Sequence, residues 1–219
     1  LRTPVPIHTH TWDVATLLQY IQKLPVNTEL SLKQLTYKLC ALLLLSTAQR
    51  VQTIHLIKVD CIYFNSSGCN IHVLDKIKQT RPSHYKCVLQ LKLYHEEKLC
   101  VVKCLREYLK RTKTLRLEAK TSQLLLCYLK PYGPAQQRLC NKMVEALVAE
   151  SSIYNFTAHS FRGAASSAMF RSDVPLDDIL KSAGWSNANT FKTFYNKPVQ
   201  GKVVDKVSTD SILHYFAKE

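Results

Sequence analysis

Four residues whose side chains can act on a phosphodiester follow one another between positions 157 and 195. His159 and Arg162 are three residues apart in Thr-Ala-His-Ser-Phe-Arg-Gly-Ala-Ala, a spacing that places both side chains on one face of a helix. Trp185 follows a glycine, and Tyr195 comes ten residues after Trp185. A cation beside a titratable imidazole can hold an anionic phosphate, and a phenol is an oxygen nucleophile. The order of these residues therefore predicts a phosphate site with Tyr195 as the attacking group.

Each of these residues also has a plain structural explanation. Tyr195 lies at helical spacing from Phe191, which is typical of a half-buried aromatic residue at a helix end. Trp185 taken alone is typical of a core residue, and His159 with Arg162 is compatible with a helix start that carries a surface cation. The joint order and spacing, together with the basic residues described below, favour the catalytic interpretation.

Several helices and one small sheet must position these residues. Hydrophobic periodicity predicts helices over residues 13–24, 31–45, 99–112, 135–149, 161–170, 175–184 and 189–195. Ser31 and Gln34 form a capping-box signature at the start of the most apolar of these helices, which we expect to be the central one. Arg50 follows it, at the junction with a second apolar pattern over residues 51–57, where a basic residue is either solvated or directed at a ligand.

Three strands are predicted over residues 61–64, 71–74 and 87–93. The fold class that follows is α+β, mainly helical, with a small three-stranded antiparallel sheet. The turn over residues 76–86 is basic. A basic turn is often only a soluble sheet edge, but it also has the shape to enter a DNA groove. Its cations are Lys76, Lys78, Arg81 and Lys86.

The positive charge of the chain is clustered. The 219 residues carry a net charge of +14, and the 41 positions from Lys76 to Arg116 hold 12 Lys or Arg and three acidic residues. This excess indicates a polyanionic partner, and double-stranded DNA is the first candidate, with Arg106 among the expected contacts. The longest apolar run, Cys40 to Leu45, is far too short to cross a bilayer, so no membrane partner is expected.

The eight cysteines are scattered without a Cys-x-x-Cys pair, and no His or Cys at ligand spacing completes a zinc site. We expect reduced, mostly buried thiols in a nuclear or cytosolic protein, and neither a metal nor another cofactor.

Together, the motifs resemble the catalytic domain of the tyrosine recombinase (phage integrase) family. His159-x-x-Arg162, then Gly-Trp185, then Tyr195 match the second half of its active site, and Thr47-Ala-Gln-Arg-Val places Arg50 where the family has its first arginine. Lys78-Gln-Thr-Arg-Pro looks like the Lys-Thr-Ser-Arg-Pro turn of eukaryotic mobile-element recombinases, which favours Lys78 over Lys76 as the family's lysine. The sequence from Trp185 to Tyr195 looks most like that of Crypton-type elements.

The resemblance implies cleavage and rejoining of DNA through a 3′-phosphotyrosyl intermediate, without metal or ATP. Arg50 and Arg162 would neutralise the phosphate, Tyr195 would attack it, and Lys78 would protonate the departing 5′-oxygen. His159 would assist proton movement or hold the phosphate, and Trp185 would donate its indole N–H. One residue departs from the family's pattern: Thr53 stands where many members have an acidic residue, so the support of Arg50 is expected to differ.

The resemblance also implies how the domain is organised. Residues 1–10 would be a lead-in, 11–198 the catalytic domain, and 199–219 a tail with a short docking helix, while the family's amino-terminal core-binding domain is absent from this chain. Assembly as a homotetramer on DNA through the tail, and location in the nucleus, are the corresponding expectations. Two alternatives remain: DNA relaxation as in a type IB topoisomerase, and a domesticated protein that binds DNA without cutting it.

Overall fold

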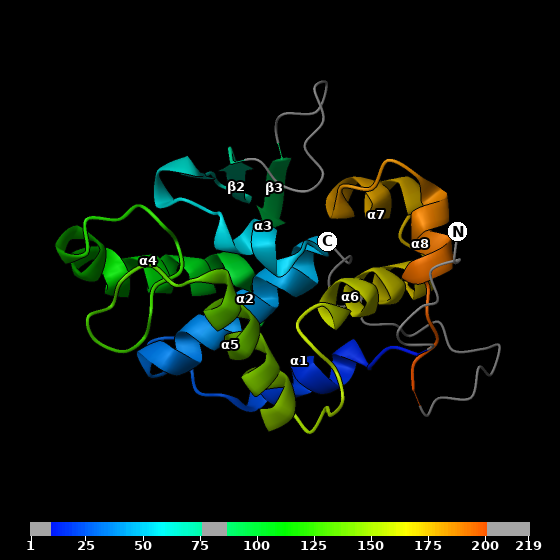
Figure 1. The fold of residues 1–219 in the computed structure, drawn as a ribbon, viewed down its shortest axis with the longest axis horizontal. Coiled ribbons are helices and arrows are strands. Elements are labelled where there is room, and N and C mark those ends of the chain that lie inside the picture. Colours follow the sequence, from blue (N-terminus) through cyan, green and yellow to red (C-terminus); the bar gives the residue numbers. More distant parts are fainter. Residues whose placement is uncertain (1–9, 76–86, 201–219) are drawn as a thin grey trace.

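Helices dominate the part of the chain that is described by the structure, a computed structural model covering residues 10–75 and 87–200. Three antiparallel strands accompany them, as the α+β prediction requires (Figure 1). The helices are α1 (Val14–Lys23), α2 (Leu32–Thr47), α3 (Val51–His55), α4 (Val101–Glu118), α5 (Gln137–Glu150), α6 (Ser160–Arg171), α7 (Leu176–Ala183) and α8 (Ala188–Phe194). The strands are β1 (Ile62–Phe64), β2 (Gly68–Val73) and β3 (Cys87–Lys92), and a 3-10 turn, η1 (Val59–Cys61), precedes β1.

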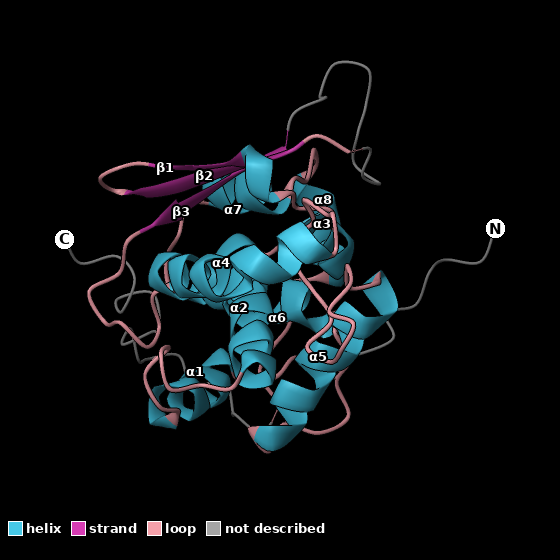
Figure 2. Ribbon diagram, turned by 90° about the vertical axis from the view of Figure 1, so that its left-hand side faces the viewer, coloured by secondary structure: helices cyan, strands magenta, loops and turns pink. Residues whose placement is uncertain are grey.

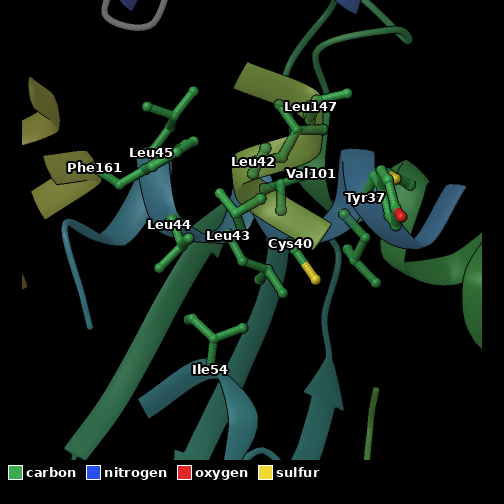
Figure 3. Close-up of a cluster of buried hydrophobic side chains, with 14 of the residues drawn as sticks. Tyr37, Cys40, Leu42, Leu43, Leu44, Leu45, Ile54, Val101, Leu147 and Phe161 are labelled. Atoms are coloured by element: carbon green, nitrogen blue, oxygen red, sulfur yellow. The ribbon is translucent and has the colours of Figure 1, made fainter. Parts of the chain in front are cut away.

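Helix α2 is the central element, as its apolar sequence predicts. Ser31 and Gln34 form the expected capping box at its start. From there the helix packs against α4, α5 and α6. Figure 3 shows its leucines, Leu42 to Leu45, among side chains of the surrounding elements, including Val101, Leu147 and Phe161. These residues are almost fully buried. Each buried leucine contributes roughly 1.5–3 kcal/mol to folding, so the junction at the end of α2 is attached to the most stable part of the domain.

The three strands form a sheet of order β1-β2-β3, and its register confirms the predicted hairpin. Strand β2 begins at Gly68, earlier than the predicted residue 71. A Cβ atom on Gly68 would lie 1.9 Å from the carbonyl oxygen of Leu91, so the two strands approach too closely there for any other residue. The sheet lies over α2 and α4 (Figure 2). The basic turn over residues 76–86 lies outside the described residues.

The predicted end of the helix over residues 99–112 was wrong. Helix α4 continues to Glu118 instead of ending at residue 112. Arg116, which lies beyond the predicted end of the helix, belongs to this extension and is buried. Its guanidinium donates to the hydroxyl of Thr112 and to the carbonyl oxygens of Gln123 and Leu124. These carbonyls, seven and eight residues further along the chain, stabilise the extra turns, and the helical periodicity gives no sign of them.

The carboxyl-terminal helices gather at one end of the molecule, where α8 lies beside the end of α6 (Figure 1). Helix α7 contacts both α6 and α8. The chain after α8 then runs beside residue 11: the N–H of Thr11 donates to the carbonyl of Pro198, and the N–H of Gln200 donates to the carbonyl of Thr11, both at 2.8 Å. Residues at the two ends of the described chain are thus held together.

All eight cysteines are free thiols, six of them buried, which agrees with the prediction of reduced and mostly buried cysteines. Burial raises the pKa of the Cys104 thiol to about 12 and that of the Cys140 thiol to about 11. Neither thiol is therefore reactive at neutral pH. Within residues 10–75 and 87–200, no helix combines the length and the apolar character that a bilayer crossing requires.

Candidate active site

Three successive helices of the carboxyl-terminal half meet around Arg162. Helix α6 carries His159 at its N-cap and Arg162 in its first turn. Helix α7 ends at Gly184, whose left-handed φ of 67° turns the chain so that Trp185 follows directly. Helix α8 ends at Tyr195, its C-cap residue. The structure therefore places the four predicted residues of the carboxyl-terminal half in one neighbourhood.

Arg162 is the most deeply buried of these residues, with 1% of its surface exposed. Its Nη1 donates to the carbonyl oxygen of Ala48 at 3.1 Å. Its guanidinium carbon lies 4.2 Å from the ring centre of Trp185 and 5.6 Å from that of Tyr195. Among the residues that the structure describes, none accepts a hydrogen bond from Nε or Nη2 of Arg162. One edge of a buried guanidinium is thus available to an anion.

Burial and a neighbouring cation both destabilise the charged form of Arg162. Burial first, and then the neighbouring cation of Arg50, lower the pKa of the Arg162 guanidinium to about 10, although the phenol of Tyr195 acts in the opposite direction. The side chain still carries its proton at neutral pH. The guanidiniums of Arg50 and Arg162 therefore repel each other, and an anion bound between them would relieve the repulsion.

Tyr195 is partly exposed and packs against the other residues of the site. Its ring centre lies 4.7 Å from that of Trp185 and 6.4 Å from that of His159. A Cβ atom on Gly163 would lie 3.7 Å from Cδ1 of Tyr195, so the ring covers the bare backbone of that glycine. The phenol is therefore next to Arg162 and outside the packed interior.

Trp185 connects these groups to the core. Its ring centre lies 5.8 Å from that of Phe191, which is fully buried. Its indole Nε1 is buried, and the described part of the chain offers it no acceptor. Together with Nε and Nη2 of Arg162, it gives three buried N–H donors in one place. Donors of this kind stabilise a phosphate oxygen strongly because little water competes for them.

Arg50 enters the site from the junction between α2 and α3. It is the N-cap residue of α3 and is partly buried. Ala48, two residues earlier, ends α2 with a left-handed φ of 49°, and its carbonyl is the group that accepts from Arg162. A non-glycine residue in this conformation costs roughly 1 kcal/mol, so packing and hydrogen bonds must hold the turn.

The turn that carries Arg50 is supported by Gln49, at a place in the family where Thr53 replaces the usual acidic residue. The side chains of Thr53 and Gln49 form a hydrogen bond of 3.2 Å between Oγ1 and Oε1. Gln49 Nε2 donates to the carbonyl of Ser182 at 2.6 Å, and the Ser182 hydroxyl donates to the carbonyl of Thr47 at 3.0 Å. These uncharged groups join the Arg50 turn to the end of α7, three residues before Trp185. Sequence reasoning missed both residues: Gln49 lies in the Thr47-Ala-Gln-Arg-Val motif but has no catalytic role of its own there, and Ser182 lies in no motif.

His159 is exposed at the start of α6. The next residue is held from the amino-terminal segment: Trp12 Nε1 donates to the Ser160 hydroxyl at 2.8 Å, and the Trp12 ring contacts Phe161 edge to face at 4.9 Å. Trp12 thereby fixes the turn of helix from which His159 projects. This anchoring residue had no signal in the sequence beyond its aromatic character.

Arg106, predicted to contact DNA, is not part of this cluster. Arg106 is exposed on α4, and its guanidinium carbon lies 4.4 Å from the ring centre of Phe64 in β1. Its contact with DNA stays a prediction. Four further residues, Lys76, Lys78, Arg81 and Lys86, lie outside the described residues. No group of three or more His, Cys, Asp or Glu in residues 10–75 and 87–200 is arranged to hold a metal ion.

The fold is similar to that of several recombinases with solved structures. The XerH site-specific recombinase, bound to palindromic difH substrate after cleavage, matches with a TM-score of 0.64 and 15% identity over 84% of this chain and 49% of its own. XerA recombinase matches with a TM-score of 0.61 and 18% identity over 91% of this chain and 65% of its own. A lambda integrase dimer bound to a COC′ core site matches with a TM-score of 0.57 and 12% identity over 94% of this chain and 52% of its own.

At these identities the similarity concerns the fold, and the chain spans about half the length of XerH. No curated protein sequence matches the chain. The Phage integrase family, in contrast, matches residues 11–200, which include Arg50, His159, Arg162, Trp185 and Tyr195. The family predicted from the motifs is thus confirmed, and the Crypton subtype stays a prediction. The chain belongs to the phage integrase (tyrosine recombinase) family.

Proposed function

We propose that this chain is the catalytic domain of a DNA recombinase that cleaves and rejoins strands through Tyr195. The observation that supports the proposal most is the placement of the Tyr195 ring, 5.6 Å from a buried guanidinium that keeps two donors without a partner among the described residues. A half-buried structural tyrosine does not require such a neighbour. A nucleophile that attacks a phosphodiester does, because the phosphate must be neutralised before another oxygen can approach.

In the proposed reaction, Tyr195 Oη forms a bond to phosphorus while the bond from phosphorus to the 5′-oxygen breaks. The phenol loses its proton, with His159 as the nearby group to assist, and Lys78 gives a proton to the departing 5′-oxygen. The products are a 3′-phosphotyrosyl bond and a free 5′-hydroxyl. The reverse reaction with another 5′-hydroxyl rejoins the strand. Because the number of phosphoester bonds is conserved at every stage, rejoining requires no energy from a nucleotide, and the arginines take the charge-neutralising role that a metal ion has in other phosphoryl transfers.

Arg50 and Arg162 would bind the non-bridging oxygens of the phosphate. Guanidiniums suit this role because each offers a planar pair of donors, and Trp185 Nε1 adds a third group. The lowered pKa of Arg162 supports this assignment. In the free protein the two cations repel each other. In the transition state both attract the negative charge that develops on the phosphate, and an interaction that is stronger in the transition state than in the ground state accelerates the reaction.

The proposed partner is double-stranded DNA, on which the chain assembles as a homo-oligomer. Solved relatives include a lambda integrase tetramer bound to a Holliday junction and XerH bound to its DNA substrate. We propose that the tail, residues 199–219, provides the protomer contact and that Lys76, Arg81, Lys86 and Arg106 contact the duplex. Sedimentation of DNA complexes tests the first point: removal of residues 201–219 should leave monomers on DNA. The salt dependence of binding tests the second, with a slope decreasing by about 0.9 for each lost phosphate contact.

The finer assignment is to Crypton-type mobile elements of eukaryotes, with action in the nucleus. This assignment rests on the Lys78-Gln-Thr-Arg-Pro sequence and on the sequence between Trp185 and Tyr195. Imaging of the tagged full-length protein in eukaryotic cells tests the location, and exclusion from the nucleus would contradict it.

A suicide DNA substrate tests the main proposal. A nick near the scissile phosphate lets the short leaving strand diffuse away, so the covalent protein–DNA adduct accumulates and can be resolved on a denaturing gel. The wild-type chain should form the adduct, and Tyr195→Phe should bind DNA equally well and form none. DNA binding by the wild-type chain without any adduct would favour the domesticated binding protein instead.

A further inference from the structure

One face of α6 runs alongside the segment that carries Tyr195. Residues at intervals of four lie on the same face of a helix, and His159, Gly163, Ser167 and Arg171 follow this spacing. Each contacts the stretch from residue 195 to residue 197. The rings of His159 and Tyr195 are neighbours, the Tyr195 ring covers Gly163, and Arg171 Nη1 donates to the carbonyl of Lys197 at 3.1 Å. We call these four residues the α6 stripe.

Ser167 is the member of the α6 stripe that holds the backbone of Tyr195 itself. Its side chain is fully buried. Its hydroxyl donates to the carbonyl oxygen of Tyr195 through a short hydrogen bond, and Oγ of Ser167 also accepts the N–H of Lys197 at 3.1 Å. One hydroxyl therefore binds the chain on both sides of residue 196.

Helix α8 could not hold this segment alone. The N–H groups of Tyr195 and Asn196 both bond back to the carbonyl of Phe191, at 2.9 and 2.8 Å, which ends the helix. The Tyr195 carbonyl lies beyond the last turn, where a helix has no partner of its own to offer. The partner comes from α6, the helix that also carries Arg162. Tyr195 and the guanidinium of Arg162 are thus both held by the same helix, α6.

We propose that Ser167 is a positioning residue that fixes the phenol of Tyr195 relative to the phosphate held by Arg162. This inference rests on the function proposed above. Ser167 does not touch the reacting atoms; it acts through the backbone of Tyr195. Effective attack needs the reacting atoms aligned at about 3–3.5 Å, and a displacement of about 1 Å can cost roughly 100-fold in rate.

The chain contains a matched control one residue away. Ser166 is also fully buried on α6, but its hydroxyl donates to the carbonyl of Arg162 at 2.7 Å, within its own helix. Ser166→Ala and Ser167→Ala remove the same atom from adjacent buried positions, and only the second releases Tyr195. The contacts of Pro198 and Gln200 with Thr11 remain in both variants, so the segment after α8 stays attached.

The experiment compares the full chain with Ser166→Ala and Ser167→Ala on the suicide substrate, at saturating protein, so that the rate of adduct formation reports a single turnover. Ser167→Ala should lower this rate about 10- to 100-fold, with the DNA dissociation constant changed by less than about two-fold. Ser166→Ala should stay within about three-fold. Hydrogen exchange of the Lys197 amide should speed up in Ser167→Ala alone, because the acceptor of that N–H has been removed.

If Ser167→Ala fails to fold, Ser167→Cys keeps the side-chain shape with a much weaker donor and should show the same loss of rate with intact binding. A Ser167 variant that folds and forms the adduct at the wild-type rate would overturn the positioning role, as would an equal loss in Ser166→Ala. A wild-type chain that forms no adduct would refute the proposed function, and the positioning role with it.

Discussion

The guanidinium of Arg162 stacks on the indole of Trp185, with its carbon 4.2 Å from the ring centre. Stacking fixes the plane of the guanidinium, so that Nε and Nη2 point along a defined edge. The indole Nε1 of Trp185 is likewise buried and has no acceptor among the described residues. Trp185 therefore has two separable functions, to orient Arg162 and to donate its own N–H.

Substitutions of Trp185 separate these functions. Trp185→Phe keeps an aromatic face for Arg162 and removes the N–H, so the rate of adduct formation should decrease about 10-fold, as for the loss of one hydrogen bond to a charged group. Trp185→Ala removes both and should decrease it further. Trp12→Phe is the control, since it also loses an indole hydrogen bond, to Ser160, but outside the proposed phosphate site. A Trp185→Phe chain as fast as wild type would contradict the donor role.

The Gln49 network predicts a coupling between two neutral side chains. Gln49→Ala should lower the free energy of unfolding by about 1–3 kcal/mol, because buried groups on Thr53 and Ser182 lose their partner. Thr53→Val should cost about 1 kcal/mol. If the two side chains act as a pair, the double variant loses less than the sum of the single losses. Urea denaturation of the four chains measures the coupling, and strictly additive losses would contradict it.

Lys38 predicts a stability that increases with pH. Its side chain is fully buried in α2 and its Nζ has no hydrogen-bond partner among the described residues. Burial lowers the pKa of the Lys38 ammonium, and Lys98 lowers it less, while Cys104, Glu97 and Glu96 act in the opposite direction. Below this lowered pKa, folded and unfolded chains are both protonated, and the full cost of burying the charge applies. Between it and the ordinary value near 10.4, the unfolded chain binds more protons, so stability increases with pH.

Lys38→Met measures this contribution. The variant should be more stable than wild type at neutral pH, and the difference should shrink as the pH approaches 10. Taking the difference also removes the opposing titration of buried thiols, which both chains share. Lys33→Met, on the exposed side of the same helix, should change little at any pH. A constant difference between wild type and Lys38→Met over the whole range would show that Lys38 does not titrate in the folded state.

A change of leaving group tests Lys78 as the general acid. Lys78→Ala should slow cleavage of ordinary DNA by about 100-fold or more, in the range found for general acid catalysis. A substrate with sulfur in place of the departing 5′-oxygen should restore most of the rate, because a thiolate leaves without a proton. Lys76→Ala, which should weaken DNA binding only, is compared at saturating protein and should then cleave both substrates at close to the wild-type rate. The reverse pattern, with rescue confined to Lys76→Ala, would assign the acid to Lys76.

Local patterns predicted the parts of this fold that local interactions determine. The capping box at Ser31 and the glycine stop at Gly184 both appear in the structure where the sequence places them. The grouping of His159, Arg162, Trp185 and Tyr195 was also predictable, because three of the family's motifs follow one another within forty residues. The left-handed Ala48 was not, since such a turn ordinarily favours glycine.

The residues that sequence reasoning missed act across the fold. Gln49 bonds to a carbonyl 133 residues away, and Ser167 to one 28 residues away. A buried glutamine or serine has no periodic signature, and its role depends on which backbone group tertiary packing brings to it. The supports of an active site are therefore harder to predict than the reactive residues, whose chemical types restrict the choice.

Identification of the amino acid bound to DNA tests the role of Tyr195 most directly. The adduct from the suicide substrate is digested with nuclease and trypsin, and the peptide that retains a nucleotide is sequenced by mass spectrometry. The predicted result is a nucleotide joined through its 3′-phosphate to Tyr195. A nucleotide on any other residue, or linkage through a 5′-phosphate, would contradict attack by Tyr195 on the phosphodiester.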